Sequence, residues 1–117
     1  GLGSITSLRA FEKVTKFKFD FFVSPGINIK MLDFAKKNQF LFIPGVSTPS
    51  EIQTAIEHDC NILKYFHAEK NGGAKSLKFL EEIFNEIKFI PTGGINNENK
   101  DNYFALDNVI AVGSTNI

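Results

Sequence analysis

The sequence predicts an α/β protein in which parallel strands alternate with helices. Short apolar runs end at turn residues at a regular pitch of about 20 to 24 residues. Strands that are apolar throughout and separated by amphipathic segments are typical of a parallel sheet covered by helices. The steady pitch, without a six-residue glycine-rich fingerprint, favours a β/α barrel over a doubly wound sheet. The runs end at Gly3, Val23, Ile43, Phe66, Ile90 and Val112.

A complete (β/α)8 barrel, or TIM barrel, has eight strands, and six runs are found here. We therefore expect residues 1–117 to form a single domain that corresponds to an incomplete TIM barrel, from its third to its eighth strand. In this interpretation the first two strand–helix units and the last helix are missing, and both ends of the chain, Gly1 and Ile117, look cut.

The first half of the chain is predicted to contain three strands and three helices. Residues 1–3 end a truncated strand, and apolar runs over 19–23 and 41–43 predict two more, each followed by proline and glycine. Apolar residues at helical spacing predict helices over 7–17 and 27–37. Thr48 is expected to cap a third helix whose first turn contains Glu51.

The second half repeats the same unit. Strands are expected over 62–66, 88–90 and 109–112, and helices over about 74–85 and 99–106. Glycine-containing turns close the last two strands, at Thr92-Gly93-Gly94 and at Gly113-Ser114. Glycine lets backbone N–H groups approach an anion, and the loops after the seventh and eighth strands of such barrels commonly bind phosphate. Either a phosphate site or a pair of plain tight turns fits this pattern.

One lysine, Lys64, interrupts the apolar strand over 62–66. Desolvation of an ammonium is costly and lowers its pKa, and a neutral amine is what a Schiff-base nucleophile requires. The alternative is a structural lysine that snorkels from the strand or pairs with Glu69. Active sites of these barrels lie at the carboxyl ends of the strands. Lys18 and Lys88 open their strands, whereas Lys64 lies two residues before its strand ends, so Lys64 is the catalytic candidate.

Composition excludes several other classes of function. Lysine and arginine total 13 and so do aspartate and glutamate, so there is no net charge to attract nucleic acid or an anionic membrane. No apolar run approaches the roughly 20 residues of a membrane span. The single cysteine, Cys60, excludes an internal disulfide, suits a reducing compartment and is expected to be a buried thiol rather than a metal ligand.

Five sequence motifs follow one another in an order that resembles a known family. They are FVSPG at 22–26, IPGVST at 43–48, LKYF at 63–66, AEKNGG at 68–73 and FIPTGGI at 89–95. The chain resembles, over essentially its whole length, the 2-keto-3-deoxy-6-phosphogluconate (KDPG) aldolases, a family that includes 4-hydroxy-2-oxoglutarate aldolases. The resemblance implies a class I aldolase without metal or organic cofactor, located in the cytoplasm and assembled as a homotrimer.

The resemblance also implies roles for individual residues. Lys64 matches the Schiff-base lysine of the family. Pro25 and Phe66 match residues that line the pyruvate pocket, and Ser4 falls where the family usually has a threonine that contacts the keto acid. The positions around the substrate phosphate match Thr92, Gly93, Gly94 and Ser114.

Departures from the family pattern leave alternatives open. The general acid/base glutamate and the carboxylate-binding arginine belong to the missing second strand. His67 replaces a usual proline, where it is either a proton carrier or a histidine that faces solvent. Val112 replaces the first glycine of the usual Gly-Gly-Ser turn, which removes some room for phosphate.

The substrate expected from the resemblance is KDPG, cleaved to pyruvate and glyceraldehyde 3-phosphate. Residues 1–117 alone are expected to be inactive. One alternative substrate is unphosphorylated 4-hydroxy-2-oxoglutarate, cleaved to pyruvate and glyoxylate. An alternative of another class is a noncatalytic phosphate-binding barrel.

Overall fold

The structure is a computed structural model that describes residues 1–114. Ile117, at the end expected to be cut, lies outside the described residues. The elements in chain order are α1 (Leu8–Val14), β1 (Phe22–Val23), α2 (Ile29–Lys37), β2 (Phe42–Ile43), β3 (Gly45–Val46), α3 (Pro49–Glu57), β4 (Ile62–Phe66), α4 (Gly73–Ile83), β5 (Lys88–Thr92) and α5 (Lys100–Phe104).

The strands are parallel and lie beside one another in sequence order. β1 pairs with β2, and β3, β4 and β5 form a second sheet in that order. β2 and β3 are one continuous stretch of chain interrupted at Pro44. Isolated parallel bridges extend the series at both sides, from Leu2 to Phe22 and from Phe89 to Val109. This succession of six parallel segments confirms the expected incomplete barrel, and residues 1–114 do not close into a complete one.

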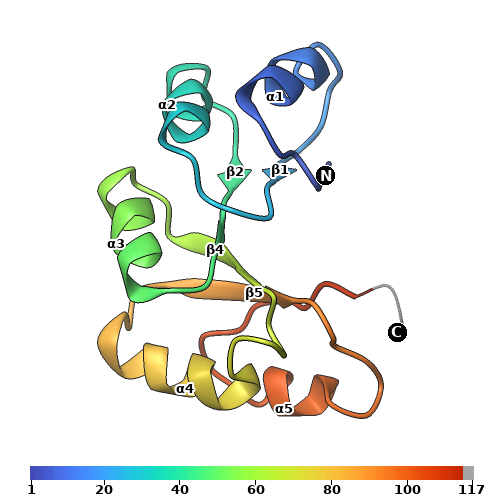
Figure 1. Cartoon of the computed structure of the whole chain (residues 1–117), viewed down its shortest axis with the longest axis vertical. Coiled ribbons are helices and arrows are strands. Elements are labelled where there is room, and N and C mark those ends of the chain that lie inside the picture. Colours follow the sequence, from blue (N-terminus) through green and yellow to red (C-terminus); the bar gives the residue numbers. More distant parts are fainter. Residues whose placement is uncertain (115–117) are drawn as a thin grey trace.

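The helices form an arc outside the strands (Figure 1). Thr48 caps α3 as expected, with a capping box in which Thr48 accepts from the N–H of Glu51 and the Glu51 carboxylate accepts from the N–H of Thr48. α1 is shorter than predicted and ends at Val14, with Ser7 as its N-cap. Phe17, which was predicted to lie in that helix, is 57% exposed. Burial of its side chain therefore does not stabilise a longer helix.

Two predicted strands exist only as isolated bridges. Residues 1–3 pair with β1 through Leu2, and residues 109–112 pair with β5 through Val109. Within residues 1–114 each of these segments has a strand neighbour on one side only, so the hydrogen-bonded ladder is not continuous. The predicted strand over 19–23 is likewise reduced to β1, because Phe19 and Asp20 are exposed.

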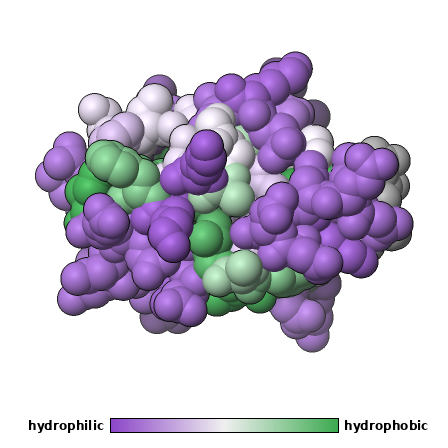
Figure 2. Space-filling view, turned by 90° about the horizontal axis from the view of Figure 1, so that it is seen from below, coloured by the Kyte–Doolittle hydropathy of each residue, from purple (hydrophilic) through white to green (hydrophobic). Residues whose placement is uncertain are grey.

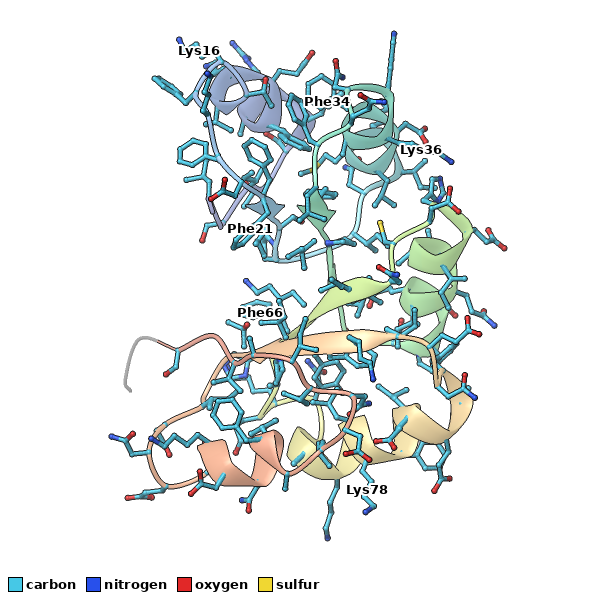
Figure 3. All side chains as sticks on the ribbon, turned by 180° about the vertical axis from the view of Figure 1, so that it is seen from behind. Lys16, Phe21, Phe34, Lys36, Phe66 and Lys78 are labelled. Atoms are coloured by element: carbon cyan, nitrogen blue, oxygen red, sulfur yellow. The ribbon has the colours of Figure 1, made fainter. Side chains whose placement is uncertain are left out.

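Burial alternates along β4 and β5 and defines two faces of the sheet. Leu63, Tyr65 and Phe89 are buried in an apolar core shared with α3, α4 and α5. A second core, around Phe11, joins α1 and α2 to β1 and β2. Lys64 and Phe66 lie on the opposite face of β4, away from the helices, where a complete barrel has its interior. Figure 3 shows Phe66 on this open side of the sheet.

Candidate active site

The strand register gathers the predicted site residues at one edge of the sheet. Gly45 pairs with Lys64, and Phe66 pairs with Thr92. Thr92 in turn bridges Gly113, directly before Ser114. At the other side, the N–H of Ile5, the residue after Ser4, donates to the carbonyl of Val23 at the end of β1. The carboxyl ends of neighbouring parallel strands therefore carry all the predicted site residues.

Lys64 lies on the interior face of β4 near its carboxyl end. Burial lowers the pKa of its amine below the ordinary value of 10.5. Its Nζ atom lies 4.7 Å from the centroid of the Phe66 ring. No carboxylate within residues 1–114 forms an ion pair with it, because Glu69 accepts instead from the hydroxyl of Tyr103. The structural alternative in which Lys64 pairs with Glu69 is therefore wrong.

The other two lysines of the predicted strands lie away from this edge. Lys88 is the first residue of β5, pairs with Ile62 and donates from Nζ to the carbonyl of Asp107 at 3.2 Å. Lys18 precedes β1 and is exposed. Both positions agree with the sequence-based assignment of these lysines to the amino ends of the strands.

Pro25 is held beside the strand next to Lys64. The N–H of Gly45 donates to the carbonyl of Gly26 at 3.1 Å, which ties the turn after β1 to β3. A Cβ atom on Gly45 would lie 2.2 Å from the carbonyl oxygen of Pro25, so only glycine fits there. The buried hydroxyl of Ser24 donates to the carbonyl of Gly26 and closes the turn. Because Gly45 is the strand partner of Lys64, this turn and the lysine share one rigid frame.

The four residues predicted to surround phosphate lie together. An open pocket is lined by Phe66, His67, Thr92, Gly93, Gly94, Ile95, Gly113 and Ser114. Gly93 and Gly94 adopt φ values of 107° and 77°, which favour glycine. Val112 does not line this pocket and instead packs, half-buried, against the apolar core. The side chain of Val112 therefore points away from the lining of this pocket, and its effect on the room for phosphate stays a prediction.

His67 was only partly anticipated. Its side chain is half-buried, and a Cβ atom on Gly93 would lie 2.6 Å from its Cγ atom. The ring thus packs on the Gly93 backbone and also lines the open pocket at the ends of β4 and β5. The peptide bond between Phe66 and His67 is cis.

Sequence reasoning missed Tyr103 altogether. Tyr103 is buried in α5, and its hydroxyl donates to Oε2 of Glu69 in the loop after β4. Burial, and then the hydrogen bond and charge of Glu69, raise the pKa of Tyr103. No local pattern signals this pair, because its members are 34 residues apart.

Cys60, the single cysteine, was expected to be a buried thiol. Cys60 is half-buried rather than fully buried, and burial raises the pKa of its thiol. Residues 1–114 contain no group of three or more side chains placed to hold a metal ion. Within the same residues, no helix has the length and apolar character needed to cross a membrane.

Comparison with known proteins gives a consistent result. The family model described as KDPG and KHG aldolase matches residues 1–117. The chain is 36% identical over 115 residues to the 2-dehydro-3-deoxy-phosphogluconate aldolase of Dickeya dadantii, covering 98% of this chain and 54% of that protein. The chain thus spans about half the length of the curated relatives that it matches.

Two solved structures are similar in fold as well as sequence. One is the KDPG aldolase of Legionella pneumophila with pyruvate captured as a covalent carbinolamine, with a TM-score of 0.91, 35% identity, and coverage of 95% of this chain and 54% of that one. The other is the KDPG aldolase of Zymomonas mobilis with 3-phosphoglycerate, with a TM-score of 0.93, 26% identity, and coverage of 97% and 54%. On the family match, the sequence identity and the fold, the chain belongs to the KDPG and KHG aldolase family.

Proposed function

We propose that the full-length protein is a class I aldolase that cleaves KDPG to pyruvate and glyceraldehyde 3-phosphate, with Lys64 as its Schiff-base nucleophile. One observation carries this proposal: Lys64 is a partly desolvated lysine, with a lowered pKa and no carboxylate partner within residues 1–114, at the carboxyl edge of a parallel sheet. The covalent carbinolamine of the Legionella pneumophila relative supports it by analogy.

The chemistry follows from a neutral amine at this place. Lys64 Nζ attacks the C2 carbonyl of the keto acid, and the carbinolamine loses water to give a cationic iminium. The iminium accepts the electron pair of the C3–C4 bond when the C4 hydroxyl loses its proton, which releases the aldehyde and leaves an enamine. Protonation of the enamine at C3 and hydrolysis of the imine then release pyruvate and restore Lys64.

The other site residues receive roles by position. We propose that Pro25, Phe66 and Ser4 line the pyruvate end, and that Thr92, Gly93, Gly94 and Ser114 surround the phosphate. The pocket formed at the carboxyl ends of β4 and β5 supports the second set. The general base and the arginine that binds the carboxylate would come from the part of the full-length protein that precedes these strands, as the family resemblance implies.

One observation favours the alternative substrate, 4-hydroxy-2-oxoglutarate. The hydroxyl of Ser114 donates to the carbonyl of Ile95, so its proton is already engaged. A phosphate group is bound by hydrogen-bond donors. The hydroxyl of Ser114 would have to turn away from the carbonyl of Ile95 to donate to a phosphate. Cleavage of the unphosphorylated substrate requires no such change.

We also propose that residues 1–117 form one domain of a cytoplasmic homotrimer. Exposed apolar side chains support a further interface, among them Phe79, Ile83 and Phe104 on α4 and α5. The face that bears these two helices is mainly hydrophilic but is interrupted by apolar patches (Figure 2). The single cysteine suits a reducing compartment.

The test uses the full-length protein. Pyruvate release is measured with KDPG and with 4-hydroxy-2-oxoglutarate for the wild type, Lys64→Met, Ser114→Ala and the control Lys88→Met. We expect cleavage to be lost in Lys64→Met and kept in Lys88→Met, with a higher kcat/KM for KDPG that falls in Ser114→Ala. Equal values for the two substrates, with no loss in Ser114→Ala, would favour the unphosphorylated alternative.

A further inference from the structure

His67 is the first residue after β4, and its imidazole lies against the turn that follows β5. The backbone around it is fixed, because the N–H of Ala68 donates to the carbonyl of Thr92 at 2.8 Å and the N–H of Glu69 donates to that of Gly93 at 3.2 Å. A Cβ atom on Gly94 would lie 3.2 Å from Cε1 of the imidazole. The ring is therefore packed over both glycines of the turn.

The contacts of the ring determine which nitrogen carries the proton. The backbone N–H of Lys70 donates to Nδ1 of His67 at 3.3 Å, so Nδ1 acts as an acceptor. In a neutral imidazole the proton is then on Nε2. Nε2 has no hydrogen-bond partner within residues 1–114. The ring thus offers an uncommitted N–H donor.

This donor belongs to a side chain that lines the pocket at the ends of β4 and β5. The hydroxyls that line the same pocket already donate to backbone carbonyls, Thr92 to Ile90 at 3.3 Å and Ser114 to Ile95 at 2.5 Å. Among the described residues of the pocket, His67 is therefore the side chain whose donor proton is not engaged by the protein.

We propose that the Nε2–H of His67 donates a hydrogen bond to the phosphate group of the substrate and so makes His67 a specificity-determining residue. The inference rests on the proposed function, because it requires an anion in this pocket. Proline, the residue usual in the family at this position, offers no such donor. A hydrogen bond to a charged acceptor stabilises binding more than a neutral one does, so its loss is measurable.

Two variants of the full-length protein separate the donor from the ring. His67→Phe keeps a flat ring on Gly93 and removes the donor, whereas His67→Gln keeps an N–H donor and removes the ring. We expect His67→Phe to raise the KM for KDPG about tenfold, as loss of a charge-assisted hydrogen bond implies. The increase with 4-hydroxy-2-oxoglutarate should be much smaller, and His67→Gln should keep most of the preference for KDPG.

Binding of inorganic phosphate gives a second readout that does not depend on turnover. In the full-length protein with 15N-labelled histidine, the Nε2 signal of His67 should shift and saturate as phosphate is added, and His67→Phe should bind phosphate about tenfold more weakly. Equal phosphate affinity in wild type and His67→Phe would overturn the role of His67. A wild type that binds phosphate through His67 but does not prefer KDPG would instead contradict the proposed substrate.

Discussion

The Nζ atom of Lys64 lies 4.7 Å from the centroid of the Phe66 ring, on the interior face of β4. Lys64 and Phe66 are two residues apart on one strand, so their side chains project to the same side of the sheet. In the proposed mechanism the ring keeps water from the amine, which favours the neutral nucleophile, and its negative face attracts the cationic iminium that would form later. Phe66 thus acts on both charge states of Lys64.

Replacement of Phe66 separates these two effects. In the full-length protein, Phe66→Leu keeps apolar bulk but removes the π face, so the iminium with pyruvate should be less stable by about 0.5–1 kcal/mol. The fraction of enzyme trapped by borohydride at a fixed subsaturating pyruvate concentration should fall accordingly. Phe66→Tyr keeps the π face and is the control. Equal trapping in Phe66→Leu and wild type would show that the ring contributes only bulk.

Lys64 should make the stability of the full-length protein depend on pH. Its folded-state pKa is lowered below the ordinary value of 10.5. Below the folded pKa both states hold the proton, and the full cost of the buried ammonium is present. Between the folded and unfolded pKa values only the unfolded state holds the proton, so stability rises with pH and the cost disappears above the unfolded value.

Lys64→Met removes this cost and should therefore raise Tm at pH 7. The gain should shrink as the pH approaches 10.5. Thermal unfolding of wild type and Lys64→Met at pH 7 and pH 10 measures the difference, with the exposed Lys78→Met as control. A gain that grows with pH would mean that the amine is stabilised, rather than penalised, in its charged form.

The hydrogen bond from Tyr103 to Glu69 should hold the loop after β4 against α5. Tyr103 is 1% exposed, so Glu69→Ala leaves a buried hydroxyl without its acceptor and should cost about 1–3 kcal/mol. Tyr103→Phe removes the hydroxyl itself, and because Glu69 is exposed to water the cost should be nearer 1 kcal/mol.

Urea unfolding of Glu69→Ala, Tyr103→Phe and the double variant tests whether Glu69→Ala lowers the free energy of unfolding more than Tyr103→Phe does. The double variant should be about as stable as Tyr103→Phe, because Glu69 has lost its role once the hydroxyl is absent. Tyr103→Phe being clearly the more damaging single change would contradict the account.

Much of the fold could be predicted from the sequence because its signals are local. β4 begins and ends where the apolar run does, and α3 begins after the Thr48 cap. The single strand expected over 41–43 continues beyond Pro44 as β3, because proline has no N–H for the ladder and only interrupts it. Residues 1–3 and 109–112 have the composition of strands, but a strand also needs neighbours, which composition does not supply.

The positions of the candidate site residues could be predicted to the same extent. Lys64, Thr92 and Ser114 are placed by the ends of strands, and the ends of strands can be read from turn residues. The packing of His67 on Gly93 and the bond from Tyr103 to Glu69 join segments that are distant in sequence. Such contacts depend on how loops meet in space, and no residue pattern of their own announces them.

A polypeptide limited to residues 1–117 should be less stable than the full-length protein and inactive. Within the described residues, the segments at Leu2 and Val109 pair on one side only, which leaves apolar strand edges open. Phe66, on the interior face, is 37% exposed, so a side chain of the barrel interior lacks part of its cover. Thermal unfolding and pyruvate release are compared for the two polypeptides. A cooperative transition at the same temperature, with cleavage at a comparable rate, would show that residues 1–117 suffice.

The central claim is that Lys64 forms the Schiff base, and reduction with borohydride in the presence of pyruvate tests it most directly. The trapped full-length protein is digested, and the modified residue is located by mass spectrometry. We predict a single pyruvate-derived adduct on Lys64, because this lysine has a lowered pKa and lies at the carboxyl edge of the sheet. An adduct on Lys18 or Lys88, or none at all, would contradict the assignment.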